Sequence, residues 1–442
     1  MIKLPEQVNK AICLLKNSGF EAYAVGGAVR DCLLGKVPFD WDITTSARPE
    51  ETEKVFCGER IIETGIKHGT VTVIIDGMPL EITTYRIDGD YTDHRHPQTV
   101  SFSDNLRDDL SRRDFTINTL CCNCDDKIID AFGGKDDLKN KIIRCVGDPD
   151  TRFSEDALRI MRAVRFSAEL GFKIEKNTSD SILKNRQLLS DVSKERLQVE
   201  FTKLITGKYA TDVIRKYHAV IEVFIPELAP LAECEQHTKY HKYDVFEHTL
   251  HAVDAIDFND RILRLTMFFH DFGKPDAKTT DENGTSHFKG HAVISEKKTR
   301  DILKRLKFDN NTINEVSKLV LIHDMKSPRD KIQAKKMMCS LGDETYLNLI
   351  KIKRADNMAK ADPHAIDEKH KNMRSFYEEI KINNECYNLK SLAVNGDDIK
   401  AFGIAEGKEI KSSLDFLLNG VIEGKCQNRK DVLLEYLKEN TK

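Results

Sequence analysis

The sequence predicts an α+β protein, in which a small mixed sheet with helices is followed by all-helical domains. Short β-type runs are confined to the part before about residue 145; among them are EAYAVGG, DWDITTS, GTVTVII and PLEITTYR. Beyond that point helical periodicity takes over, as in SEDALRIMRAVRFSAELGF. A chain of 442 residues is also too long for one ordinary core. We therefore expect four regions, which are 1–145, 146–235, 236–360 and 361–442.

The elements can be placed in order along the chain. The first 20 residues predict an amphipathic helix of the mature protein, because no apolar block ends in a small-residue cleavage site. GTVTVIIDGMPLEITTYR predicts a β-hairpin, formed by two β-rich runs around Asp76-Gly77-Met78-Pro79. KERLQVEFTKLITG predicts a helix closed by Gly207. The region 236–360 stays helical and holds most of the histidines, and 361–442 is helical and rich in Lys and Glu.

Composition excludes several classes of protein. The net charge is −3, so any contact with nucleic acid must use local patches rather than an overall positive charge. The sequence contains no run of about 18 apolar residues, so no membrane span is predicted. The 11 cysteines are scattered and odd in number, which indicates reduced thiols in the cytoplasm. Cys121, Cys122 and Cys124 lack a second pair at zinc-finger spacing and are interpreted as hydrophobic residues of a strand.

Two aspartates, Asp40 and Asp42, stand one residue apart in PFDWDITTS, shortly after Gly26 and Gly27. On a strand both side chains would point to the same face, where their charges repel unless a cation lies between them. Mg²⁺ is the expected ion, because it takes one or two carboxylates and completes its shell with substrate phosphates and water. The double glycine would admit a triphosphate, and Arg30 could pair with it. The alternative is an edge strand with two surface aspartates.

These residues resemble the signature of nucleotidyltransferases with a polymerase-β-type head, in which Glu81 would be a third carboxylate on a neighbouring strand. Later motifs narrow the resemblance: DLSRRDFTIN at 109–118, RFSEDALR at 152–159, and SKER at 193–196. In this order they are similar to the class II tRNA nucleotidyltransferases, which are the CCA-adding enzymes and the related bacterial poly(A) polymerases. The resemblance covers about the first 210 residues. It implies a polymerase-β-type head followed by a helical neck.

Asp156 and Arg159 can be interpreted by their chemistry as well. At the start of a helix they would lie on one face, and a carboxylate only accepts hydrogen bonds whereas a guanidinium only donates them. Cytosine and adenine both present an amino donor beside a ring-nitrogen acceptor, while guanine and uracil present the reverse order. One Asp–Arg pair could therefore select C and A. The alternative is a surface ion pair at a helix start.

The resemblance assigns roles residue by residue. Asp40 and Asp42 would be catalytic and would hold Mg²⁺. The incoming CTP or ATP would be bound by seven residues: Gly27, Arg30, Arg113, Asp156, Arg159, Arg162 and Arg165. Further candidates are Glu81, Asp114 and Glu155. The partners implied are CTP, ATP and the 3′ end of tRNA with its backbone and acceptor stem.

The segment YRIDGDYTDHRHPQTVSF resembles the flexible loop that this family needs to switch from C to A. Relatives that add only CC tend to lack it, so full CCA addition is expected. His96 stands where the family more often has an arginine, which leaves A-only addition or poly(A) polymerase activity as the alternative. The other explanation is an ordinary polar connection, because Gly89, Asp93 and Pro97 are turn formers.

The histidines of the region 236–360 follow the order His, His-Asp, His, His, Asp, which resembles the HD phosphohydrolase superfamily. The resemblance implies a site for Mn²⁺, Fe²⁺, Ni²⁺ or Zn²⁺ and a metal-bound water that attacks a phosphate ester. Its ligands would be His248, His270, Asp271, His291, His323 and Asp356.

Two basic clusters, 331–336 and 351–354, either contact tRNA backbone or form solvated helix faces. Two competing functions also remain open: a phosphohydrolase whose head only binds RNA, and a purely structural RNA-binding module.

Overall fold

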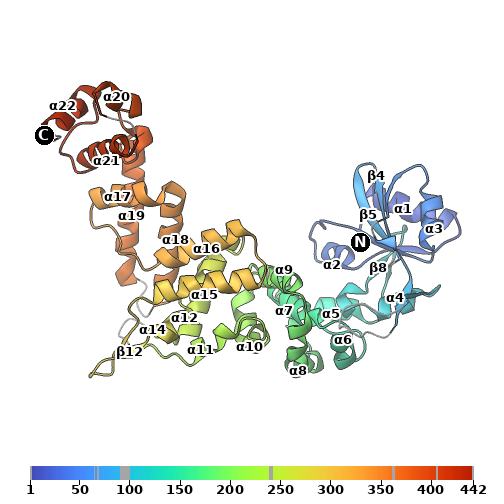
Figure 1. Ribbon diagram of the computed structural model, residues 1–442. Coiled ribbons are helices and arrows are strands. Elements are labelled where there is room, and N and C mark those ends of the chain that lie inside the picture. The colour runs from blue at the N-terminus through green and yellow to red at the C-terminus, as the bar shows by residue number, and fades with distance from the viewer. Residues whose placement is uncertain are drawn as a thin grey trace. The chain divides into compact units, whose positions relative to one another are not determined.

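The computed structural model describes residues 2–63, 65–66, 69–89, 100–237, 242–360, 364–404 and 407–440. Two compact units make up the chain, Met1–Ala229 and Pro230–Lys442. Figure 1 shows the first in blue to green and the second in green to red. The predicted division into four regions is finer than this and stays a prediction.

A seven-stranded mixed sheet forms the centre of the first unit and confirms the predicted fold class. The strand order is β3-β4-β5-β2-β1-β8-β9. Only β2 and β5 pair in parallel; the other neighbours are antiparallel. The bounds are β1 Ala22–Val25, β2 Asp42–Thr45, β3 Arg60–Ile62, β4 Thr70–Ile75, β5 Met78–Thr84, β8 Cys121–Cys122 and β9 Ile128–Ile129. A separate pair joins β6 Arg86–Asp88 to β7 Val100–Phe102.

The predicted hairpin is present as β4 and β5, with Ile75 opposite Met78. Asp76 and Gly77 form its two-residue turn at φ values of 47° and 82°. Two successive positive φ values are typical of the type I′ turn, which matches the twist of the flanking strands. The turn therefore fixes the register that carries Glu81 to its place on β5. The cysteine interpretation is confirmed for Cys121 and Cys122, which form the buried strand β8, but not for Cys124, which lies in the following turn and is half-buried.

Helices surround this sheet and then continue without strands of comparable size. In the head, α1 buries Val8, Ala11, Ile12 and Leu15 along one face, as its amphipathic pattern predicts. The head helices are α1 Glu6–Asn17, α2 Gly27–Leu33, α3 Pro49–Val55, α4 Leu106–Ser111 and α5 Gly134–Asn140. The following helices are α6 Pro149–Glu155, α7 Leu158–Leu170, α8 Lys176–Asn185, α9 Lys194–Ile205 and α10 Ala210–Ile221.

Helix α7 is the central element of this helical part, because it packs against both α9 and α10. It ends at Gly171, which has a φ of 69°. The predicted stop at Gly207 lies two residues beyond α9. A Cβ on Gly207 would stand 2.8 Å from the backbone of Ala168, so glycine allows the turn after α9 to approach α7 closely.

The second unit is almost entirely helical. Its helices are α11 Ala229–Ala232, α12 Val245–Asp254, α13 Arg261–Phe269, α14 Lys274–Ala277, α15 His291–Arg305, α16 Asn310–Ile322, α17 Lys331–Leu341, α18 Asp343–Met358, α19 His364–Ile382, α20 Gly396–Ala401, α21 Lys408–Ile422 and α22 Lys430–Asn440. Helices α15 and α16 lie side by side (Figure 1). A short pair, β12 Thr279–Thr280 and β13 Ser286–His287, interrupts the helices. None of the helices in the described part of the chain has the length and apolar character needed to cross a membrane.

Candidate functional sites

The head site is built on the two parallel strands of the sheet. Asp42 opens β2, and Glu81 lies on β5 directly opposite it in the ladder. On the other side of β2, Asp42 stands opposite Val25, the last residue of β1. The chain then turns through Gly26 into α2. The predicted third carboxylate is therefore on the neighbouring strand and in register with Asp42.

Asp40 lies outside the strand on which it was expected. Strand β2 begins only at Asp42, and Asp40 is an exposed residue of the loop that precedes it. Between the two, Trp41 is buried and anchors the end of the loop. Trp41 also accepts a 3.4 Å backbone hydrogen bond from Glu81. Strand alternation consequently does not place Asp40; its position depends on this anchored loop.

Negative charges converge on Asp42. Burial, together with nearby Glu81 and Asp40, raises the pKa of the Asp42 carboxyl to about 6, against the lowering effect of Arg113. Carboxylates crowded in this way repel one another, which favours a cation bound between them. Oxygen donors of this kind fit Mg²⁺, which prefers carboxylates and water. The head residues thus fit the expected metal.

Gly26 lets the backbone pass close to these side chains. Its φ is 81°, and a Cβ at this position would lie 3.3 Å from Nη1 of Arg113 and 3.8 Å from Oδ2 of Asp42. A larger residue would therefore be strained and would crowd the site. Arg30, one turn into α2, is buried; it donates to Oδ1 of Asn118 at 2.8 Å and pairs with Asp31 at 2.8 Å.

Arg113 is held by a buried carboxylate that the sequence reasoning did not select. Asp109 pairs with Arg112 at 2.7 Å and with Arg113 at 3.3 Å, and it accepts a 3.0 Å hydrogen bond from Thr44 on β2. Burial opposes ionisation of Asp109, but Arg113 and Arg112 hold its pKa below the ordinary value. Nε of Arg113 is buried and has no hydrogen-bond partner among the described residues. The Arg113 guanidinium therefore lies close enough to Asp42 to lower the pKa of that carboxyl, while Asp109 holds its Nη2 end.

The helical part of the first unit corrects the expectation for Asp156. Rather than sitting inside one helix with Arg159, Asp156 separates α6 from α7 in an extended conformation, with φ −134° and ψ 100°. Its Oδ1 accepts a 3.2 Å hydrogen bond from the backbone of Leu158 at the start of α7. The break turns Asp156 out of the helical path, so it is not an i, i+3 neighbour of Arg159 in a continuous helix.

Asp156 and Arg159 do not pair with each other; each is held by other groups. Arg196 on α9 binds both carboxylate oxygens of Asp156, at 3.0 and 3.1 Å. Arg159 pairs with Glu155 at 2.8 Å and donates to the backbone oxygen of Arg112 at 2.7 Å. The surface ion pair considered from the sequence is therefore absent between these two residues.

Further along α7, Arg162 and Arg165 are bound by carboxylates. Arg162 makes two contacts to Oδ2 of Asp114, at 2.8 and 2.7 Å. Burial disfavours the charged form of Asp114, but Arg162 and Asn118 hold its pKa down at about 2. Arg165 pairs with Glu200 and Glu169, each at 2.7 Å. These pairs attach the head and α9 to α7.

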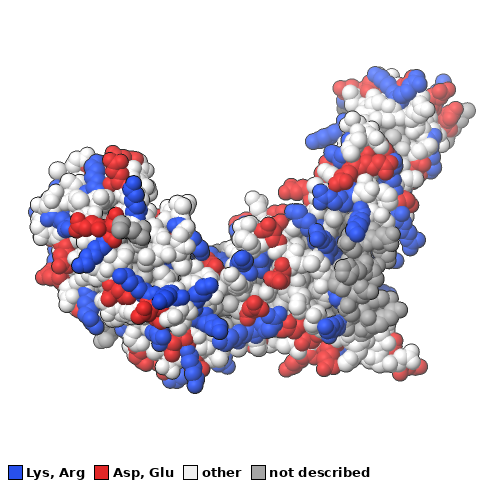
Figure 2. Space-filling view, turned by 180° about the vertical axis from the view of Figure 1, so that it is seen from behind, with Lys and Arg blue, Asp and Glu red and all other residues white. Residues whose placement is uncertain are grey.

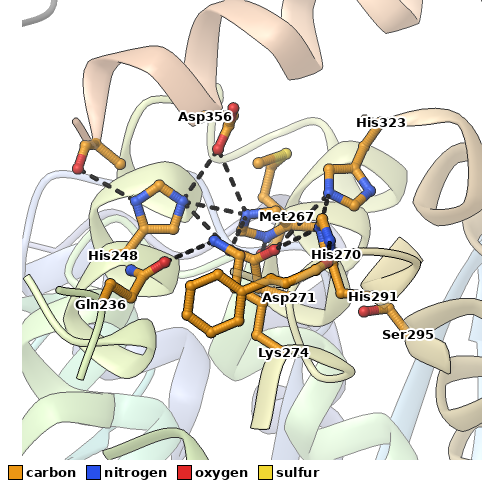
Figure 3. A network of polar contacts seen from close by, with 12 residues as sticks. Gln236, His248, Met267, His270, Asp271, Lys274, His291, Ser295, His323 and Asp356 are labelled. Carbon is orange, nitrogen blue, oxygen red and sulfur yellow. Dashed lines mark hydrogen bonds and ion pairs between the residues drawn. The ribbon is translucent and has the colours of Figure 1, made fainter. Parts of the chain in front are cut away.

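In the second unit, the six predicted ligands come together (Figure 3). His248 lies on α12, His270 and His323 directly follow α13 and α16, His291 begins α15, and Asp356 lies on α18. Two overlapping groups could each hold a metal ion, one of His248, His270 and Asp271 and the other of Asp271, His291 and His323. Asp271 belongs to both groups.

Backbone carbonyls orient all four imidazoles. The Nδ1 atoms of His248, His270, His291 and His323 lie 3.2, 2.7, 2.8 and 2.6 Å from the oxygens of Ala359, Met267, Phe288 and Val320. An Nδ1–H that donates to a carbonyl leaves Nε2 free with a lone pair, which is the arrangement typical of metal-bound histidines. The Nε2 atoms converge, with 3.4 Å between His248 and His270 and 3.1 Å between His291 and His323.

Buried charge balances this cluster. Asp271 lies 3.0 Å from Nε2 of His270, 3.4 Å from that of His291, and 2.7 Å from Nζ of Lys274. Asp356 lies 3.0 Å from Nε2 of His248 and 2.5 Å from Nζ of Lys360. Burial holds the pKa of His323 down at about 3 and also lowers that of His248, so both imidazoles are neutral, as ligands must be. The donor set fits a divalent transition metal.

The two basic clusters form ion pairs within the second unit. In the first cluster, Lys331 pairs with Glu379 at 2.6 Å and Lys336 with Glu423 at 2.6 Å. In the second, Lys351 pairs with Asp260 at 3.4 Å. Figure 2 shows blue and red side chains interspersed over the visible face rather than one continuous basic surface. These contacts favour solvated, paired helix faces over dedicated RNA contacts.

Sequence reasoning missed Asp109, Arg196, Lys274 and Lys360. Three of them carried a signal: Asp109 and Arg196 stand inside quoted motifs, and Lys274 follows His270-Asp271 by three residues. Lys360 had no such signal, because only the end of α18 brings it to Asp356. The proposed C-to-A loop, with His96, lies for the most part outside the described residues.

The mixed sheet, its aligned carboxylates and the adjoining arginines define a nucleotidyltransferase head. The family model described as the poly A polymerase head domain matches residues 22–144, and the one described as tRNA nucleotidyltransferase domain 2 matches 279–437. A third, described as a probable RNA and SrmB-binding site of polymerase A, matches 171–231.

Whole-chain comparisons identify the family. The CCA-adding enzyme of Lactobacillus helveticus is 33% identical to this chain, over 99% of this chain and 98% of its own length. The CCA-adding enzyme of Geobacillus kaustophilus is also 33% identical, over 99% of this chain and 97% of its own length. The crystal structure of the Bacillus stearothermophilus CCA-adding enzyme in complex with CTP superposes with a TM-score of 0.71 at 31% identity, covering 98% of this chain and 96% of that one. The chain belongs to the CCA-adding enzyme family of tRNA nucleotidyltransferases.

Proposed function

We propose that this chain builds or repairs the 3′-terminal CCA of tRNA from CTP and ATP, without a nucleic-acid template. The observation that carries the proposal is the alignment of Asp42 with Glu81 beside Arg113 in a member of this family. In the reaction the 3′ oxygen of the RNA forms a bond to the α-phosphorus of the nucleotide. The bond from that phosphorus to the bridging oxygen breaks, and pyrophosphate leaves.

Within the head, Asp40 and Asp42 would hold Mg²⁺, with Glu81 as a third carboxylate. Bound Mg²⁺ would stabilise charge on the attacking and leaving oxygens. Gly26 and Gly27 leave room for the triphosphate, and the Arg113 guanidinium, whose Nη1 lies beside Gly26, would pair with it. Arg30 lies nearby on α2 and would add positive charge. Asp109 holds Arg113 in place for this contact.

Base selection would fall to Asp156 and Arg159. Asp156 would accept a hydrogen bond from the amino group that cytosine and adenine share, and Arg159 would donate to their ring nitrogen. Arg196, Glu155 and the Arg112 carbonyl hold the two side chains before any nucleotide arrives. Guanine and uracil would leave buried donors and acceptors unpaired. Arg162 and Arg165 would complete the nucleotide site. Each would bind the nucleotide either in place of its present carboxylate partner or together with it.

One extension assay tests this function. Purified protein is incubated with tRNA that lacks CCA, CA or A, with CTP and ATP supplied separately and together. We expect CTP to extend the first two substrates and ATP the third. Asp42→Asn should reduce each extension by about a thousandfold, because several kcal/mol of charge stabilisation would be lost. Incorporation of ATP alone would establish the A-adding alternative, which the named relatives do not favour. We also propose that the enzyme acts in the cytoplasm.

We further propose that the six-residue site in the second unit binds one or two divalent transition-metal ions and hydrolyses phosphate esters. The four oriented Nε2 atoms and the shared Asp271 support this second activity. The bound metal would supply a nucleophilic water at neutral pH. The test compares Mn²⁺ or Ni²⁺ content and hydrolysis of a 2′,3′-cyclic nucleotide in wild type and in His270→Ala. Wild-type protein that binds neither ion would contradict the proposal.

A further inference from the structure

Two apolar side chains stand almost fully in water beside the head site. Phe39 is 103% exposed and Val37 is 95% exposed, more than any other large hydrophobic residue in the described part of the chain. The next values are 78% for Ile382 and 62% for Val293. Single exposed hydrophobic residues are common on proteins, but a fully exposed phenyl ring contributes none of the stabilisation that its burial would give.

The loop that carries them is fixed at both ends. At its start, the backbone of Lys36 donates to the oxygen of Asp31 at 2.9 Å. At its end, Trp41 is buried and Asp42 enters the sheet. Pro38 restricts the backbone between Val37 and Phe39. Phe39 is therefore held directly before Asp40, without being packed into the protein.

In the proposed reaction, the RNA substrate brings its last base, a flat and partly apolar group, to the loop that carries Phe39. The 3′ oxygen of the RNA has to reach the metal held by Asp40 and Asp42, so the last base of the RNA lies within a few ångströms of the carboxylates. The incoming base is proposed to be read elsewhere, by Asp156 and Arg159. The terminal base of the acceptor therefore needs a partner of its own.

We propose that Phe39, flanked by Val37, is the stacking surface for the terminal base of the tRNA acceptor end. The identity of that base changes as the reaction proceeds, from a variable base to C and then to C again. A contact that reads hydrogen bonds could not serve all three steps, whereas stacking on an aromatic ring tolerates every base. Lys36, exposed in the same loop, adds a positive charge suited to the neighbouring phosphate. This proposal rests on the proposed function of the head.

Steady-state kinetics with Phe39→Ala tests the contact. Stacking contributes about 1–3 kcal/mol per base, so the KM for tRNA should rise about tenfold, within a range of roughly 5- to 150-fold. The affinity of the tRNA-free protein for CTP should stay unchanged, and Phe39→Tyr should restore the wild-type KM. Because the ring is fully exposed, the substitution should leave the thermal midpoint unchanged. Phe258→Ala, which removes a partly exposed ring from the second unit, is the matched control.

Fluorescence provides a direct readout. Phe39→Trp adds an exposed indole to a chain whose one tryptophan, Trp41, is buried. Binding of tRNA that lacks CCA should quench this added emission, while the emission of the wild type stays the same. An unchanged KM in Phe39→Ala, an equal loss of CTP affinity, or an indole that tRNA does not quench would each overturn the proposal. Failure of the wild type to extend tRNA at all would instead contradict the proposed function.

Discussion

At the scale of single residues, the head depends on one carboxyl group whose surroundings are unfavourable without a cation. Asp42 is partly withdrawn from water, and it shares its site with Glu81 and Asp40. Arg113 offsets only part of this charge, since the pKa of Asp42 still lies near 6. Protons and Mg²⁺ should therefore compete for the same oxygen atoms.

This competition predicts the pH dependence of metal binding in the head. A raised pKa means that Asp42 takes up a proton as the pH falls through about 6, so Mg²⁺ affinity should weaken below that value. At pH 5, one unit lower, about one carboxyl in eleven is ionised, and the apparent Kd should be about tenfold higher than at pH 8. Calorimetric titration of Asp271→Asn protein, in which the second site is disabled, measures this without nucleotide. An affinity that is constant from pH 5 to 8 would contradict the prediction.

At the scale of elements, the interruption between α6 and α7 defines the geometry of base selection. A continuous helix would point Asp156 and Arg159 the same way and let them pair. The extended backbone at Asp156 separates them, and Arg196 reaches across from α9 to hold the carboxylate. The orientation of the proposed template therefore depends on how α9 packs against α7.

Removing this support should reduce selectivity. Arg196→Met deletes both hydrogen bonds to Asp156 while keeping an aliphatic chain, so the preference for CTP over UTP should fall by about 5- to 150-fold, corresponding to 1–3 kcal/mol. The ratio of kcat/KM for the two nucleotides measures it. Lys203→Met, an exposed basic residue of the same helix, is the control. A lower kcat with an unchanged ratio would indicate that Arg196 serves only stability.

The contact between Asp114 and Arg162 should contribute measurably to the free energy of unfolding. Arg162 and Asn118 hold the pKa of the buried Asp114 at about 2, below the ordinary value of 3.8. A lowered pKa stabilises the folded state above pH 3.8, and this stabilisation disappears as the pH falls toward 2. It corresponds to about 2 kcal/mol. Asp114→Asn should lose it at pH 7 and show a flatter decrease in unfolding free energy between pH 4 and 2, measured by urea denaturation.

The sequence predicted those helices and strands whose turn residues and hydrophobic pattern match the structure around them. The Asp76–Gly77 turn fixed the β4–β5 hairpin, and with it the place of Glu81. The sequence could not predict that β2 starts only at Asp42, because Asp40 and Trp41 belong to the same β-type run, DWDITTS.

The sequence also could not predict which side chains hold the proposed site residues in place. Arg196 and Asp156 are 40 residues apart, and only the packing of α9 on α7 joins them. The order of the histidines, in contrast, was sufficient to identify the cluster around Asp271. Side chains that cluster in one place could be recognised from their order along the chain, whereas pairings between helices require the three-dimensional structure.

At the scale of the whole molecule, the two proposed metal sites belong to different compact units. The head site lies in Met1–Ala229, and the histidine cluster lies in Pro230–Lys442. The second unit buries Asp271 and the four imidazoles of its cluster, and Lys274 and Lys360 pair with Asp271 and Asp356 there. A metal that binds this cluster in the folded state alone should therefore stabilise the second unit.

Calorimetric unfolding tests this separation. Mn²⁺ at 100 times its Kd should stabilise the second unit by about 2.7 kcal/mol and raise the midpoint of its transition. His270→Ala should abolish that shift and leave CTP incorporation intact, because the head keeps Asp40 and Asp42. Asp42→Asn should do the reverse, losing incorporation while keeping the Mn²⁺ shift. If His270→Ala abolished incorporation as well, in protein that stays folded, the two sites would be coupled. Their assignment to independent activities would then be wrong.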